Sequence, residues 1–99
     1  MIKDSIIHAL ADTELEEANK KHPPFQTAHE AYGVILEEMQ EVEEALERAK
    51  EQFAEVWDCV RHDMSIKHDL GFLAENMADV VKEAVQVMAM CKKGMKLNG

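Results

Sequence analysis

Apolar side chains recur along most of this chain at the spacing of α-helices, and one pair of prolines interrupts the pattern. Between residues 2 and 20, isoleucine, leucine and alanine share one helical face, which predicts a first helix from about Ile2 to Lys20. His22-Pro23-Pro24 follows. Because proline lacks an amide proton and disfavours helical backbone in the residue before it, we expect a break there. No segment has the apolar-polar alternation of a strand.

A second helical pattern begins after the prolines. Thr27 and Glu30 have the spacing of a capping box, so the helix should start near Thr27. Its apolar positions alternate three and four residues apart, which predicts a heptad seam. The seam consists of Tyr32, Ile35, Met39, Val42, Leu46, Ala49 and Phe53, and the same spacing continues through Val56, Val60 and Met64. Residues 50–66 either extend this helix or form a separate one; compact packing favours turns near Ala49–Gln52 and around Lys67–Gly71.

A last helix is predicted from about Leu70 to Lys93, with Gly94 as its stop signal. The chain therefore reads as an all-α protein, a single domain over residues 1–99 that packs three long or four shorter helices as a bundle. The seam and the apolar face of the last helix offer more apolar surface than such a short chain can cover. We therefore expect an oligomer.

Composition narrows the functional classes. The chain has 20 acidic and 11 basic residues, a net charge of −9, which disfavours nucleic acid as a partner. No apolar run is long enough for a membrane span, and no signal peptide is evident, so a cytoplasmic protein without a membrane partner is expected. Cys59 and Cys91 are far apart and are interpreted as apolar filler residues.

Acidic residues are concentrated in the second helix. Nine glutamates lie between Glu30 and Glu55, against two basic residues, and such a run is usually a solvated face. At about 100° per residue, however, Glu38 lies only about 60° from Ile35, inside the apolar arc, and Glu41 lies at its edge. A carboxylate that faces a core needs a counter-charge, a hydrogen-bond network or a metal ion.

The last helix has a similar polar line, formed by Asn76, Asp79 and Glu83 within a partly apolar sector, and Gln86 continues this line toward solvent. Acidic residues three or four apart project from one side of a helix. Two such helices face to face would present several hard oxygen ligands, which suit Mg²⁺ or Mn²⁺. A structural network of ion pairs is the alternative interpretation.

One segment is similar to a known family. Residues 23–41, PPFQTAHEAYGVILEEMQE, resemble the short MazG-like proteins of bacteria and their phages, which are all-α nucleoside triphosphate pyrophosphohydrolases. Within it, Glu38-Met39-Gln40-Glu41 matches the ExxE half of the metal motif of that superfamily. Residues 83–90 look like its last helix, and the resemblance covers roughly residues 15–92.

The resemblance implies a MazG-like fold and a hydrolase that acts on nucleotides. Its members cleave a (d)NTP with water to the (d)NMP and pyrophosphate, which implies a role in nucleotide-pool housecleaning. It implies Mg²⁺ held by Glu38 and Glu41 together with Asp79 and Glu83, and dimers or tetramers as the active units. Glu37 is a candidate for positioning the attacking water.

The second half of the motif departs from the family pattern. In place of ExxD, this chain has asparagine first in Asn76-Met77-Ala78-Asp79, and glutamine last in Glu83-Ala84-Val85-Gln86. Asn76 is then a neutral ligand or a nearby hydrogen-bond donor, and His29 and Gln86 are candidate contacts to the substrate. The alternative function is a non-catalytic helical module that binds nucleotides or oligomerises with a degenerate site.

Overall fold

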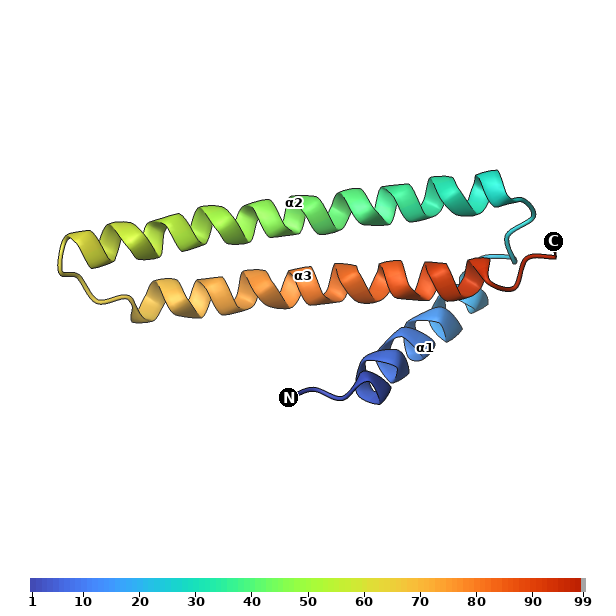
Figure 1. The fold of residues 1–99 in the computed structure, drawn as a ribbon, viewed down its shortest axis with the longest axis horizontal. Helices are drawn as coiled ribbons and strands as arrows, with labels where there is room; N and C mark the ends of the chain where they lie inside the picture. Colours follow the sequence, from blue (N-terminus) through green and yellow to red (C-terminus); the bar gives the residue numbers. More distant parts are fainter. Residues whose placement is uncertain (99) are drawn as a thin grey trace.

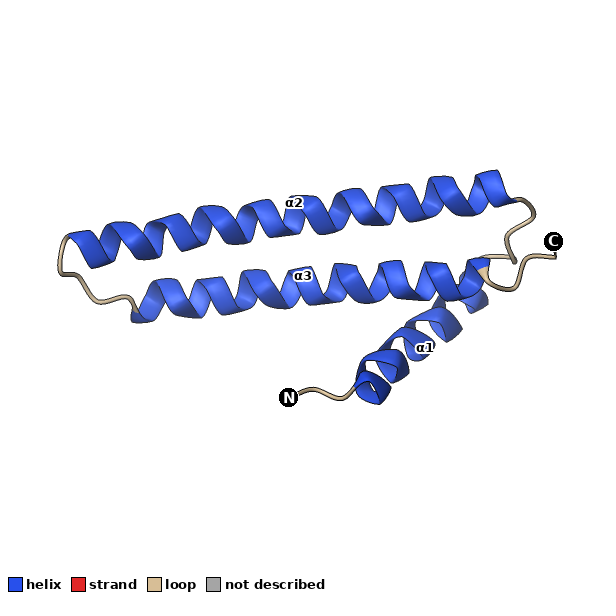
Figure 2. Cartoon of the chain, in the orientation of Figure 1, coloured by secondary structure: helices blue, strands red, loops and turns tan. Residues whose placement is uncertain are grey.

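The computed structural model describes residues 1–98, and they form three α-helices (Figure 1). Helix α1 spans Asp4–Lys21, α2 spans Ala28–Arg61 and α3 spans Lys67–Gly94. The two long helices α2 and α3 form an antiparallel hairpin, and α1 lies obliquely against the C-terminal part of α3. The described residues contain helices and connections without a strand, so the expected all-α class is confirmed (Figure 2).

Helix α3 is the element that holds the molecule together. It packs against both other helices, whereas α1 and α2 make no packing contact within residues 1–98. The resulting shape measures 58 × 26 × 21 Å. Its radius of gyration of 17.3 Å exceeds the about 13 Å of a compact domain of this length. In the part of the chain that the structure describes, no helix combines the length and the hydropathy needed to cross a bilayer.

The start of α2 follows the sequence signals. Thr27 Oγ1 accepts a hydrogen bond from the amide of Glu30 at 3.1 Å, which confirms Thr27 as the N-cap. The Glu30 carboxylate accepts from the amide of Gln26 at 3.3 Å, one residue before the position that a capping box would use. The prolines do end α1, and the following Phe25 lies under Lys93, whose Nζ is 4.7 Å from the ring centroid.

The prediction of a turn near Ala49–Gln52 is wrong, because α2 runs unbroken for 34 residues. The second turn is also misplaced: the chain reverses at residues 62–66, and α3 begins at Lys67. Residues 49–52 contain neither glycine nor proline, so nothing local ends the helix there. The partner helix α3 has 28 residues and covers most of α2. The long hairpin therefore forms without the additional turn that compact packing would favour.

Helix α2 ends in a Schellman motif. The amide of Met64 donates to the carbonyl of Cys59 at 2.9 Å, and the amide of Asp63 donates to the carbonyl of Val60 at 3.2 Å. Asp63 occupies the left-handed position with φ of 53°. Glycine is the usual residue there because a Cβ is strained in this region, and aspartate is one of the few tolerated replacements.

The interior between the helices is built from small side chains. Ala45 and Ala49 are only 1% and 2% exposed, and no large side chain of the described residues is fully buried. The buried apolar residues are Ala11, Ala31, Ala45, Ala49, Val56, Ala89 and Met90. Small residues allow two helices to approach closely, but they bury little apolar area.

Seven large apolar residues of α2 lie outside this contact. We call them the exposed stripe: Tyr32, Leu36, Met39, Leu46, Phe53, Trp57 and Val60. Tyr32 is 70% exposed, Phe53 63% and Trp57 60%, so these side chains of the predicted helix are not covered within one chain. The predicted seam consists of two rows of residues seven positions apart. One row is half-buried or buried, namely Ile35, Val42, Ala49 and Val56. The second row is replaced by residues one position earlier, namely Ala31, Glu38, Ala45, Gln52 and Cys59.

Polar bonds join α2 to α3 near the turn. Asp69 accepts a hydrogen bond from Gln52 Nε2 at 3.0 Å and another from the Cys59 thiol at 3.2 Å. The bond to Asp69, followed by burial, raises the pKa of Cys59. The interpretation of Cys59 as an apolar filler is therefore incomplete, because its thiol is a hydrogen-bond donor between two helices.

We expect Asp63→Gly to stabilise the protein by about 0.5–1 kcal/mol, because glycine adopts the left-handed conformation without Cβ strain. Asp63→Ala keeps the strain, loses the polar side chain and should lower the melting temperature. Urea denaturation followed by circular dichroism measures both. Equal destabilisation by the two substitutions would contradict this description of the turn.

Candidate functional site

Three carboxylates from two helices converge in the middle of the hairpin. Glu38 and Glu41 project from α2, and Glu83 projects from α3. One oxygen of each carboxylate lies within 4.8 Å of the other two. Glu38 and Glu83 are half-buried and Glu41 is exposed, so the cluster opens to solvent on one side. We refer to these three residues as the acidic cluster.

The position of Glu38 follows from the face that α2 turns toward α3. Ala31 and Ala45 lie seven residues before and after it, so all three share one row along the helix. Both alanines are buried against α3, at 6% and 1% exposure. Glu38 is thus the charged member of an otherwise small and buried row. The sequence-derived angle that placed Glu38 inside the apolar arc agrees with this position.

The acidic cluster is electrostatically unfavourable without a cation. Burial, and then the charges of Glu41 and Glu83, raise the pKa of Glu38. Burial and hydrogen bonding to Glu41 raise the pKa of Glu83, although nearby Arg48 acts in the opposite direction. None of the ion pairs among residues 1–98 includes a member of the acidic cluster.

One atom of the acidic cluster has no partner. Glu38 Oε2 is buried and accepts no hydrogen bond from the described residues. A buried carboxylate oxygen that is left unsatisfied is strongly destabilising unless a donor or a cation reaches it. The donor set is all carboxylate, which matches the preference of Mg²⁺ and Mn²⁺ for hard oxygen ligands. The residues therefore fit a divalent cation, whereas the expected ion pairs of a structural network are not formed here.

Asp79 lies outside the acidic cluster. It is exposed and pairs with Lys82 at 3.9 Å, one helical turn before Glu83. Its charge still contributes to the raised pKa of Glu83. Asn76 is half-buried, about 10 Å of helix rise from Glu83. Glu37 is exposed beside Glu38, and its charge makes a small contribution to the raised pKa of Glu38.

Two predicted substrate contacts lie elsewhere. Gln86 Nε2 donates a short hydrogen bond to Glu14 Oε1, so Gln86 connects α3 to α1 and does not extend the line of polar residues toward solvent. His29 is exposed in the first turn of α2, about 13 Å of helix rise from Glu38. The sequence pattern missed the link between Glu14 and Gln86, because no short-range spacing relates residues 72 positions apart.

No family model matches this chain, and neither a curated protein nor a solved structure is significantly similar to it.

We expect Glu83→Gln to leave the metal-free protein at least as stable as the wild type at pH 7, because it removes one of the mutually repelling charges. A raised folded pKa means that the ionised carboxylate is disfavoured in the fold. The penalty is therefore present at neutral pH and disappears as the pH falls toward 4.5, the ordinary pKa of a glutamate. The stability difference between the two proteins in EDTA should shrink over the same range.

Melting curves at several pH values, with and without EDTA, provide the measurement. Mg²⁺ or Mn²⁺ at millimolar concentration should raise the wild-type melting temperature beyond the effect of matched ionic strength, and raise that of Glu83→Gln less. A network of structural ion pairs predicts the reverse, namely a destabilised variant and wild-type curves that do not move with metal.

Proposed function

We propose that this chain is an Mg²⁺- or Mn²⁺-dependent nucleoside triphosphate pyrophosphohydrolase, which converts a (d)NTP and water into the (d)NMP and pyrophosphate. The observation that carries the proposal is the convergence of Glu38, Glu41 and Glu83 around a buried carboxylate oxygen without a partner. The resemblance of residues 23–41 to short MazG-like proteins supplies the reaction and a role in nucleotide-pool housecleaning.

The charge of the site supports a substrate that arrives with a cation. Three carboxylates would repel a triphosphate, whereas a divalent ion held between them can attract it. Mg²⁺ bound there would supply Lewis acidity and positive charge at the phosphate oxygens. Glu38, Glu41 and Glu83 would hold the ion, with Asp79 one turn away as a further ligand if it leaves Lys82. Exposed Glu37 would accept a proton from the attacking water.

We also propose that the active unit is a dimer or a tetramer. Within one chain, residues 1–98 bury no large side chain completely and leave the exposed stripe of α2 open along most of the helix. Contiguous apolar surface of this kind is typical of an interaction surface. Helix bundles of this size gain a core of large side chains when copies associate.

The second candidate function is a non-catalytic nucleotide-binding or oligomerisation module. One observation favours it: Asp79 is paired with Lys82 and lies outside the acidic cluster, so only three of four expected carboxylates converge. Such a module would be stabilised by Mg²⁺ and a nucleotide without turning it over. At 100 times the dissociation constant, a bound ligand adds about 2.7 kcal/mol of stability.

A panel of ordinary and modified (d)NTPs with Mg²⁺ or Mn²⁺ separates the two functions. The enzyme should release pyrophosphate and a monophosphate in equal amounts, without orthophosphate. Glu38→Gln should lose at least about 100-fold in kcat/KM, the scale expected when a principal metal ligand is removed. Ligand-induced stabilisation with every substrate, and no product from any of them, would establish the non-catalytic module.

Calorimetric titration of Mn²⁺ tests the site without relying on activity. Glu38→Gln should lose most of the affinity, because Glu38 supplies the buried oxygen of the acidic cluster. Glu44→Gln is the matched control, since Glu44 is an exposed glutamate of the same helix and lies outside the acidic cluster. Equal isotherms for the two variants would show that the acidic cluster is not the metal site.

Light scattering tests self-association. At micromolar concentration, the wild type should have at least twice the chain mass of 11.2 kDa. Phe53→Ser, in the exposed stripe, should shift the protein toward the monomer, whereas the neighbouring Ala54→Ser should not. A stable wild-type monomer would contradict the proposed assembly.

A further inference from the structure

Positive charge is concentrated at the end of the molecule where α1 and α3 both finish. Residues 18–29 and 84–98 contain five lysines and neither aspartate nor glutamate. The other six basic residues share the rest of the chain with all 20 acidic residues. Lys20 and Lys21 lie in the last turn of α1, and Lys92 and Lys93 in the last turn of α3. This end is therefore less negative than the rest of the chain, although Glu17 pairs with Lys20 and Glu30 lies in the first turn of α2.

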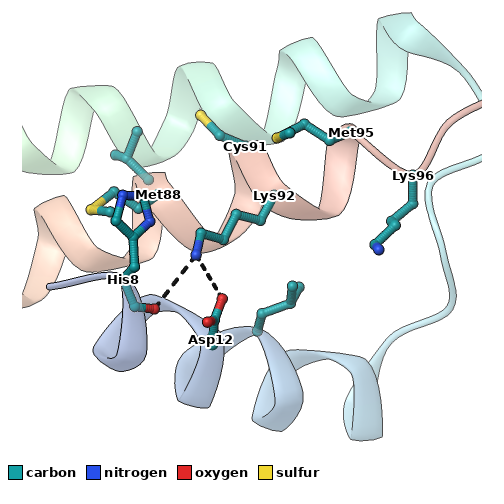
Figure 3. A pocket seen from close by; sticks show the side chains of 9 residues that line it. His8, Asp12, Met88, Cys91, Lys92, Met95 and Lys96 are labelled. Carbon is teal, nitrogen blue, oxygen red and sulfur yellow. Dashed lines mark hydrogen bonds and ion pairs between the residues drawn. The ribbon is translucent and has the colours of Figure 1, made fainter. Parts of the chain in front are cut away.

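A cavity of about 670 Å³ lies between α1 and the C-terminal part of α3 (Figure 3). This volume is within the range of small-molecule sites in proteins. Its apolar walls come from Leu15 on one helix and from Val87, Met88 and Met95 on the other side. A smaller cavity of about 280 Å³ adjoins it, since Leu15 and Lys96 line both, and adds Lys93 and His22.

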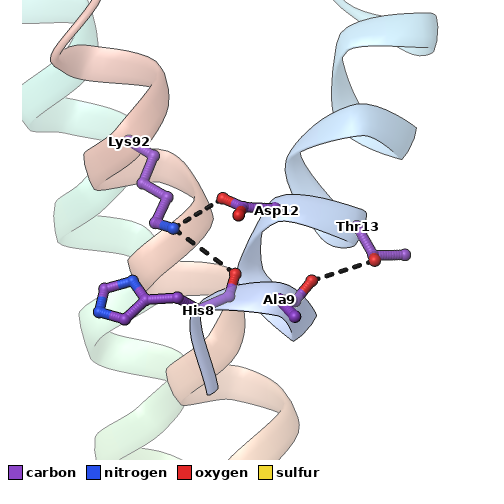
Figure 4. Close-up of polar contacts among 5 residues, drawn as sticks. All are labelled: His8, Ala9, Asp12, Thr13 and Lys92. Atoms are coloured by element: carbon purple, nitrogen blue, oxygen red, sulfur yellow. Dashed lines mark hydrogen bonds and ion pairs between the residues drawn. The ribbon is translucent and has the colours of Figure 1, made fainter. Parts of the chain in front are cut away.

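The cavity carries one uncompensated positive charge. Lys92 crosses from α3 to α1, where its Nζ lies 2.6 Å from Asp12 Oδ1 and 3.5 Å from the carbonyl oxygen of His8 (Figure 4). Asp12 therefore balances Lys92. Lys96 also lines the cavity, and no acidic side chain among residues 1–98 forms an ion pair with it. With His8 neutral, the lining has a formal charge of +1.

We propose that this cavity binds a small organic monoanion with an apolar body, namely a medium-chain carboxylic acid free in solution. The carboxylate would bind at Lys96, with Lys92 nearby, and the hydrocarbon would lie against Leu15, Met88 and Met95. A single negative charge matches the single uncompensated lysine. Flexible methionine side chains adapt to apolar ligands of different shape.

This site is separate from the acidic cluster. Glu83 and Lys92 are nine positions apart, which places their side chains on opposite faces of α3. Glu83 faces α2 in the acidic cluster, and Lys92 faces α1. The proposal therefore does not depend on the nucleotide reaction.

Octanoate is a suitable probe, and octan-1-ol is its uncharged counterpart of the same chain length. Calorimetry should show octanoate binding to the wild type, and octan-1-ol binding at least about fivefold more weakly, the scale of one solvent-accessible ion pair. In spectra of methyl-labelled methionines, octanoate should shift Met88 and Met95 and leave Met39 of the exposed stripe unchanged. Absent octanoate binding, equal affinity for the alcohol, or shifts at Met39 alone would overturn the proposal.

Charge variants assign the head group. Lys96→Gln should weaken octanoate binding about fivefold, whereas Lys82→Gln, which replaces an exposed lysine of α3 outside the cavity, should not change it. Asp12→Asn should tighten binding about threefold, because it removes a repelling charge and leaves Lys92 unbalanced.

Equal effects of Lys96→Gln and Lys82→Gln on octanoate affinity would overturn the proposal. If Asp12→Asn disrupts the packing of α1 on α3, the comparison of the two lysine variants is the deciding test. An affinity for octanoate that falls as the protein concentration rises would also overturn it, because a second copy of the chain would then be the occupant.

Discussion

The close approach of α2 and α3 through small side chains is the contact on which the rest of the structure depends. Ala45 and Ala49 are almost completely buried between the two helices, and no large side chain of residues 1–98 is buried as fully. A helix can present only part of its circumference to one neighbour. By turning its alanine row toward α3, α2 leaves Phe53 and Trp57 on the outside. The alanine row of α2 faces α3. The slender hairpin, its thin interior and the exposed stripe all follow from this orientation of α2.

The same choice brings charge into the interior. The buried row that contains Ala31 and Ala45 also contains Glu38, so the helices cannot pair closely without placing this carboxylate beside Glu83. The fold then opposes the ionised state of its own residues, as the raised pKa values of both groups indicate. Local features that reduce stability are characteristic of binding sites, where a ligand offsets them. Near the turn the same row carries Gln52 and Cys59, whose polar groups find a partner within the chain.

Local signals in the sequence predicted the helix boundaries where a specific side-chain bond or a proline decides them, as at Thr27 and at the end of α1. The turn after α2 was not predictable in the same way, because Asp63 occupies a position where glycine is the usual signal. The helical angle of Glu38 correctly predicted its partial burial, since rotation about one helix follows from sequence. The sequence analysis did not predict that Ala31 and Ala45 share the buried row with Glu38. It selected the rows with the largest apolar side chains, whereas the helices pack closely through alanine. Asp79 lies outside the acidic cluster and pairs with Lys82, and periodicity along the sequence does not describe such a side-chain contact.

Helix α1 contacts α3 but not α2, so the molecule consists of two layers joined along a single surface. Separating α1 would leave every contact between α2 and α3 in place, including the acidic cluster. Detaching α1 alone would therefore cost less free energy than global unfolding of the chain. The bonds that would break include Gln86 to Glu14 and Lys92 to Asp12. The cavity between α1 and α3 thus exists only while α1 is packed on α3. The stability of the α2–α3 hairpin does not depend on that contact.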